Sequence, residues 1–111
     1  MTIFVLLMLD DDIWQTFDEE EQAAWILKYR EFAKSFDDRI VKADPINSVG
    51  RLITSENGEI KVEAQDYAGD PNHITGYFIY QAEDWDEAEE IAKRCPTLEY
   101  GGRIELRKVG H

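Results

Sequence analysis

Two segments of this 111-residue chain are predicted to be β-strands with apolar side chains on both faces. Residues 3–9 read IFVLLML and residues 75–81 read TGYFIYQ, so neither segment alternates strictly between apolar and polar positions. A strand with one solvated face does alternate, so we expect these two to be covered on both sides. The chain has only two amphipathic helices, which can cover one face of a sheet. A symmetric homodimer, sheet against sheet, is the common way to cover the second face.

A capping box and an aromatic stripe predict the first helix, over residues 19–37. Asp18 is the expected N-cap, with Glu21 as its reciprocal partner three residues later. Aromatic residues then recur at spacings of 4, 3 and 4, which places them on one face of the helix: Trp25, Tyr29, Phe32 and Phe36.

A second capping box, from Asp84 to Glu87, predicts the other helix. Its apolar face includes Cys95, and Pro96 ends it because the residue before a proline is disfavoured in helical geometry. We interpret the Cys95 thiol as a buried structural group rather than a nucleophile.

A β-hairpin is predicted around Asn57-Gly58, because both positions of a tight hairpin turn require positive φ angles. Its strands are Leu52–Glu56 and Glu59–Gln65. The second strand alternates apolar and polar residues, so one face should be solvated, and we expect the hairpin at the edge of the sheet.

The predicted order of elements is β-α-β-β-β-β-α-β, with a last strand over residues 104–109. Setting the hairpin aside leaves a βαββαβ pattern. The fold class is therefore predicted as α+β, with a ferredoxin-like core, an inserted β-hairpin and one domain over residues 1–111.

The charge balance argues against several classes of partner. The chain has 12 Lys and Arg against 24 Asp and Glu, a net charge of −12. Nucleic acids and anionic membrane surfaces both require a basic patch, so neither is expected as a partner. One cysteine excludes an internal disulfide, and no leader or spanning segment is recognisable, which together favour a cytoplasmic location.

Four stretches, in their order and spacing, are similar to one bacterial family: DEEEQAAW, GYFIY, WDEAEEIAKRCP and YGGRIELRKV. They resemble blocks of the YCII-related, or DGPF-domain, proteins. The block from Asp86 to Pro96, followed by Glu105-Leu106-Arg107, is the most specific. The resemblance implies a single YCII-like domain, built as a dimeric α/β-barrel from ferredoxin-like subunits.

The chain departs from the family at its signature loop. The Asp-Gly-Pro-Phe motif should fall at residues 64–67, where only the aromatic position, Tyr67, is matched. Better-studied members carry a histidine on the first helix, proposed to pair with an aspartate, and residues 18–37 contain none here. The catalytic roles suggested for those members are therefore not transferred to this chain.

The loop over residues 66–73 is the candidate site. His73 is the only interior histidine and the side chain expected to titrate near neutral pH, so it is a candidate general base. Asp66 and Asp70 are candidates to orient it. The simpler interpretation is a polar loop with no role. Three tyrosines on this loop and the following strand are candidate ligand contacts: Tyr67, Tyr77 and Tyr80.

Asp10, Asp11 and Asp12 follow the first strand and are expected to be solvated at the approach to the first helix. A site for a hard cation is the alternative, but nothing nearby resembles a calcium loop. We expect neither a metal nor a cofactor.

Two functions remain open at this point. One is a small-molecule binder or enzyme, with a cleft between the 66–73 loop and the sheet face of a homodimer. The other is a non-catalytic interaction or regulatory protein whose acidic surface docks a partner protein. The sequence alone does not decide whether the protein is an enzyme.

Overall fold

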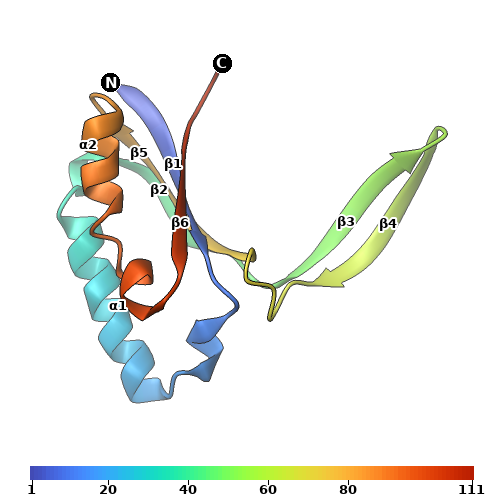
Figure 1. Ribbon diagram of the computed structural model, residues 1–111, viewed down its shortest axis with the longest axis horizontal. Helices are drawn as coiled ribbons and strands as arrows, with labels where there is room; N and C mark the ends of the chain where they lie inside the picture. The colour runs from blue at the N-terminus through green and yellow to red at the C-terminus, as the bar shows by residue number, and fades with distance from the viewer.

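A four-stranded antiparallel sheet with two helices on one face forms the body of the molecule (Figure 1). The computed structural model describes all residues, 1–111. The sheet has the order β2-β5-β1-β6. Its strands are β1 (Thr2–Leu9), β2 (Ile40–Pro45), β5 (Ile74–Ala82) and β6 (Arg103–Lys108). This is the order of a ferredoxin-like βαββαβ unit, which confirms the predicted α+β fold class.

The helices are α1 (Glu19–Lys34) and α2 (Trp85–Ala92). Three short 3-10 segments flank them in the chain: η1 (Ile13–Thr16) before α1, η2 (Asp37–Arg39) after α1 and η3 (Pro96–Tyr100) after α2. Both predicted N-caps are present. Asp18 and Glu21 form the full capping box, which is worth about 1 kcal/mol. Asp84 caps α2 through the Glu87 N–H, whereas the Glu87 side chain accepts from Glu83. Neither helix is long and apolar enough to cross a bilayer.

The core lies between the helices and one face of the sheet. Alternate residues of β1 and β5 point into it, and they meet the apolar faces of α1 and α2. These buried side chains are Phe4, Leu6, Met8, Phe78, Tyr80, Phe32, Phe36, Ala88 and Ile91. The aromatic stripe predicted part of the core correctly, because Phe32 and Phe36 both pack on Phe78. The helix itself ends at Lys34, earlier than predicted, so Phe36 lies just beyond α1.

The other face of the sheet carries no helix. We call it the helix-free face. The remaining apolar side chains of the two central strands lie there, partly buried: Ile3, Val5, Leu7, Leu9, Tyr77 and Ile79. The lack of alternation in β1 and β5 has this simple origin, since one set of apolar residues faces the helices and the other set faces away from them.

Strands β3 (Val49–Glu56) and β4 (Glu59–Asp66) form a separate two-stranded sheet, which we call the arm. The turn is at Asn57 and Gly58, whose φ angles of 50° and 82° match the predicted type of hairpin. The predicted position at the edge of the main sheet is wrong. The arm projects away from the body on the side opposite the helices (Figure 1). Local alternation specifies a hairpin but carries no information about what the hairpin packs against.

Candidate functional site

His73 lies at the end of the 66–73 loop, immediately before β5, and only 5% of its surface is exposed. Backbone hydrogen bonds hold it on both sides. Its N–H donates to the Asp70 carbonyl at 2.9 Å, and its carbonyl accepts from the Asp10 N–H at 3.2 Å. The ring of Tyr67 stacks on the imidazole, with the centroids 6.3 Å apart and the planes 21° apart. A backbone-fixed and nearly buried imidazole is therefore the centre of the candidate site.

The carboxylate closest to His73 belongs to Asp12. The distance from His73 Nε2 to Asp12 Oδ1 is 3.3 Å. The geometry is not that of a hydrogen bond, and Nε2 has no hydrogen-bond partner although it is buried. The sequence predicted Asp66 or Asp70 as the orienting carboxylate. Strand pairing explains the difference, because Leu9 pairs with Ile74 and so brings the residues after β1 next to the residue before β5.

Asp10 holds Asp12 in place. The Asp10 side chain is buried, contrary to the expectation that all three aspartates are solvated. Its Oδ1 accepts from the N–H groups of Asp12 at 2.8 Å and Ile13 at 3.2 Å, and its Oδ2 accepts from the Thr75 hydroxyl at 3.2 Å. These bonds fix Asp12 at a φ of 67°, a left-handed conformation that costs a non-glycine residue roughly 1–2 kcal/mol.

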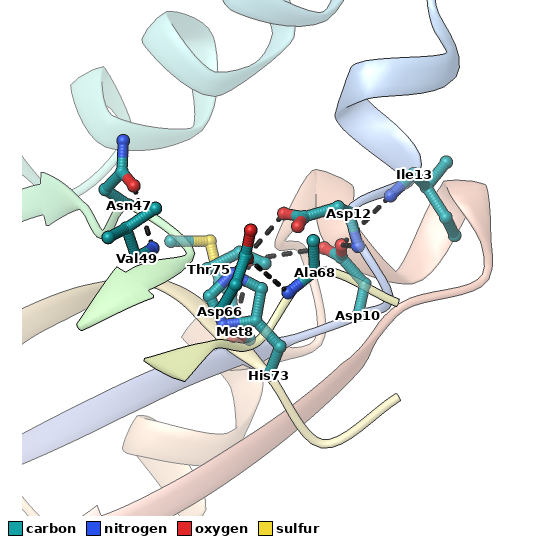
Figure 2. Close-up of polar contacts among 10 residues, drawn as sticks. All are labelled: Met8, Asp10, Asp12, Ile13, Asn47, Val49, Asp66, Ala68, His73 and Thr75. Atoms are coloured by element: carbon teal, nitrogen blue, oxygen red, sulfur yellow. Dashed lines mark hydrogen bonds and ion pairs between the residues drawn. The ribbon is translucent and has the colours of Figure 1, made fainter. Parts of the chain in front are cut away.

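Asp66 lies at the edge of the same cluster, at the end of β4. Figure 2 shows Asp12, Asp66 and His73 gathered together, with Asp10 and Thr75 beside them. The Asp66 carboxylate accepts from the Ala68 N–H at 3.0 Å. This bond, then the Ser48 hydroxyl and the charge of His73, hold the pKa of Asp66 below its usual range. Asp66 is therefore the ionised, solvent-facing carboxylate of the cluster.

The structure places the other predicted site residues away from the imidazole. The carboxylate of Asp70 accepts from the Asn72 N–H at 2.8 Å and so caps the loop. Tyr77 lies on the helix-free face, where its hydroxyl donates to Asp44 at 2.8 Å. This hydrogen bond raises the pKa of Tyr77 and lowers that of Asp44. Tyr80 is fully buried in the core and donates to the Ala88 carbonyl at 2.7 Å.

Arg103, at the start of β6, also lies in the site region, and its contacts with the 66–73 loop could not be read from the sequence. Its guanidinium donates to the Pro71 carbonyl at 2.9 Å and to Asn72 Oδ1 at 2.6 Å. It fixes the end of the loop from a neighbouring strand. Only the pairing of β6 with β1, in which Arg103 is opposite Leu9, brings it there.

The cluster places an imidazole and a carboxylate side by side, with 3.3 Å between His73 Nε2 and Asp12 Oδ1. Side chains of these two types are the usual participants in proton transfer. No group of three or more His, Cys, Asp or Glu side chains is placed to hold a metal ion. A separate surface hollow lies between the end of α1 and α2, where oppositely charged side chains including Arg39, Glu87 and Arg94 line it.

Comparisons with known proteins agree with the fold. The model of the YCII-related domain matches residues 16–110. Among solved structures, the chain is similar to 5-chloro-2-hydroxyhydroquinone dehydrochlorinase (TftG) from Burkholderia phenoliruptrix AC1100, in complex with 2,5-dihydroxybenzoquinone. The identity is 14%, the TM-score is 0.60, and the match covers 98% of this chain and 94% of that one. No curated protein matches significantly. The family model covers nearly the whole chain, and the protein therefore belongs to the YCII-related family.

Proposed function

We propose that this protein binds a small molecule with an acidic hydroxyl group at the His73 cluster, and that His73 exchanges a proton with that group. The observation that supports this most directly is the buried Nε2 atom of His73, which has no hydrogen-bond partner and lies 3.3 Å from an Asp12 oxygen. An unsatisfied buried polar atom costs roughly 1–3 kcal/mol. A hydroxyl on a bound ligand would satisfy it.

The surrounding residues have distinct parts in this proposal. Asp12 stabilises the imidazolium that forms when His73 takes the proton. Tyr67 packs over one face of the imidazole, and 37% of Tyr67 is exposed, so a flat ligand stacks on the exposed part of this side chain while its hydroxyl group approaches Nε2 from the side that Tyr67 does not cover. Asp10 and Arg103 hold the two backbone segments that carry Asp12 and His73.

The class of ligand is suggested by the solved relative, which is a chlorohydroxyhydroquinone dehydrochlorinase bound to a dihydroxybenzoquinone. Such rings are flat and carry acidic hydroxyl groups, which suits an imidazole next to a stacking tyrosine. Similarity at 14% identity supports the fold, so the dihydroxybenzoquinone enters here as a chemical probe and not as the natural ligand.

We further propose that the protein acts as a homodimer through the helix-free face. Half-buried apolar side chains occupy the centre of that face, including Val5, Leu7 and Ile79. Burial of such a patch stabilises a dimer by about 25 cal/mol per Å² of apolar surface removed from water, before the cost of association.

The test uses the two histidines of the chain, His73 and His111, as separate reporters. In ¹³C-histidine NMR spectra, titration with 2,5-dihydroxybenzoquinone should shift the His73 resonance saturably and leave His111 unchanged. His73→Asn and Asp12→Asn should each weaken binding about tenfold or more, because each removes one half of the proton-exchanging pair.

Asp11→Asn is the matched control. Asp11 is exposed, and its substitution removes the same charge as Asp12→Asn, one residue away. It should bind the probe like the unaltered protein. Equal affinity in His73→Asn, or no binding of the probe at millimolar concentration, would contradict the proposal. The interpretation as an interaction protein would then be the stronger one.

A further inference from the structure

The arm presents an apolar face that nothing in its own chain covers. Strand register places Ile53 opposite Val62 and Ser55 opposite Ile60, so these side chains share one face with Val49 and Ala64. The four large ones are exposed by 59% (Val49), 63% (Ile53), 68% (Ile60) and 62% (Val62). The reverse face is mostly polar, with Leu52 opposite Glu63 and Thr54 opposite Lys61. A two-faced ribbon of this kind is ordinarily half-buried.

We propose that the apolar face of the arm packs against the body of a second copy of this chain, and that this contact holds Tyr67 over His73. The inference rests on the homodimer of the proposed function. It adds that the arm is the element that contacts the partner, and that this contact is linked to the His73 cluster through Tyr67.

The accessible surface and the radius of gyration of a single chain are larger than expected for a compact domain, which supports a contact with another molecule. Its accessible surface is 7544 Å², whereas a compact domain of 12.9 kDa is expected to expose about 6,300 Å². Its radius of gyration is 15.9 Å, against about 13 Å for a compact chain of this length. The excess area, on the order of 1,000 Å², is what a stable interface buries on each partner, about 800 Å².

The distribution of charge favours a second copy over another partner. The chain has a net charge of −12, so two copies repel each other over most of their surfaces. The apolar face of the arm carries only Arg51 and Asp66, which cancel. The helix-free face is close to neutral as well, with three basic and two acidic side chains: Lys42, Arg103, Arg107, Asp44 and Glu105. Two copies can therefore approach on this side of the molecule.

The arm also needs a partner for its own stability. An isolated two-stranded hairpin is marginally stable in water. Beyond isolated contacts, β3 and β4 pack only on each other. Packing of Ile53, Ile60 and Val62 on a second copy would supply the missing apolar burial.

The base of the arm is part of the candidate site. Strand β4 ends at Asp66, and the next residue, Tyr67, donates its N–H to the Ser48 carbonyl at 2.9 Å across the base. The Tyr67 ring then stacks on His73. A contact that fixes the direction of the arm therefore fixes the residue that covers the imidazole.

Two neighbouring substitutions test the arm. Ile53→Lys places a charge on the apolar face, and Leu52→Lys places the same charge on the reverse face, opposite Glu63. Both positions are exposed, so both variants should fold, as circular dichroism would verify. Light scattering over a concentration series gives the dissociation constant of the dimer. This constant should be at least about tenfold higher for Ile53→Lys than for the unaltered protein, and Leu52→Lys should behave like the unaltered protein.

Val5→Lys, on the helix-free face, separates this inference from the dimer itself. If Val5→Lys dissociates the dimer and Ile53→Lys does not, the arm proposal is overturned and the homodimer stands. If the unaltered protein is still monomeric at about millimolar concentration, both the homodimer and the arm proposal fail. The apolar face of the arm would then bind a different partner.

The link to the site has its own readout. In ¹³C-histidine spectra, Ile53→Lys should shift or broaden the His73 resonance, whereas Leu52→Lys should leave it as in the unaltered protein and His111 should not respond in either. A dissociated Ile53→Lys with an unchanged His73 resonance would overturn the link.

Discussion

Strands β1 and β3 have the same length, eight residues, and both belong to antiparallel pairs with well-defined register. In β1, every second residue from Phe4 to Met8 is buried under the helices, and the residues between them are partly buried. In β3, no residue is buried and most are exposed. The apolar side chains of the body pack against a second layer of the same chain. The apolar side chains of the arm have no such layer to pack against.

This difference shows that hairpin formation and burial are separate problems. The turn at Asn57-Gly58 and the strand register specify the conformation of the arm through contacts within the arm itself. Burial of a strand face requires a second layer, which α1 and α2 supply for the body alone. The arm therefore has a well-specified conformation, and its apolar face remains exposed to solvent within a single chain.

The largest effect that separates the two regions should come from matched truncations. Leu6→Ala removes a fully buried side chain and should lower the free energy of unfolding by about 3 kcal/mol. Ile60→Ala, at a position that is 68% exposed, should change it by less than about 0.5 kcal/mol at micromolar concentration.

Urea denaturation followed by tryptophan fluorescence measures both changes. If Ile60→Ala costs as much as Leu6→Ala in dilute solution, the arm is stabilised within its own chain and the comparison fails. A cost for Ile60→Ala that appears only at high protein concentration would sharpen it, because the second copy would then be the layer that the arm uses.

Alkaline pH should act on the body and spare the arm, which contains no tyrosine. Burial raises the pKa of Tyr80 to about 12, and burial also raises the pKa values of Tyr29 and Tyr100. A raised pKa means that the folded state keeps the phenol protonated while the unfolded state loses its proton above about pH 10. This contribution to stability is complete below pH 10 and declines as the pH rises towards 12.

Circular dichroism between pH 8 and 12 should therefore show the body unfolding in that range, with a loss of about 2–3 kcal/mol from Tyr80 alone. Tyr80→Phe removes the hydrogen bond to Ala88 and should cost about 1 kcal/mol at pH 8, but its stability should depend less steeply on pH above 10. An unchanged slope in Tyr80→Phe would show that other groups control alkaline unfolding.

Two glycines give the smallest effect and contrast the regions by mechanism. A Cβ at Gly76 would lie 2.5 Å from Met8 Cε and 3.1 Å from the Asp44 carbonyl oxygen, so Gly76→Ala should cost about 2 kcal/mol through crowding. A Cβ at Gly58 would meet nothing within 4 Å, and its φ of 82° makes backbone strain the whole cost, about 1 kcal/mol.

Differential scanning calorimetry of the two alanine variants resolves them. A second substitution, Met8→Ala, should relieve part of the crowding in Gly76→Ala and leave the cost of Gly58→Ala untouched. The mechanism assigned to Gly76 is wrong if the Met8 substitution recovers nothing.

Local patterns predicted the order of elements because each depends on neighbours in sequence. The Asp18 capping box acts within a few residues, and the structure confirms it. Phe32 and Phe36 are both buried as the stripe predicted, although α1 ends before Phe36. The Asn57-Gly58 turn acts within the hairpin. The sequence strings of the family blocks add the ferredoxin-like order, which the sheet topology confirms.

The candidate site could be predicted only in part. The loop and His73 followed from residue type and position, and the structure shows that His73 is nearly buried and stacked with Tyr67. Its partner carboxylate, Asp12, lies 61 positions earlier in the chain and arrives through the pairing of Leu9 with Ile74. No local pattern distinguishes Asp12 from Asp66 or Asp70, because the choice depends on strand register.

The sequence by itself determined which segments become helices and strands, where the helices begin and how the hairpin turns. It also determined which strands carry apolar residues on both faces. These properties depend on interactions within one or two turns of chain. Only the tertiary structure decided that Asp12 faces His73, that Tyr80 belongs to the core and that the arm stands away from the sheet. Each of these depends on which distant surfaces meet, and such contacts follow from the packing of whole layers rather than from neighbours along the chain.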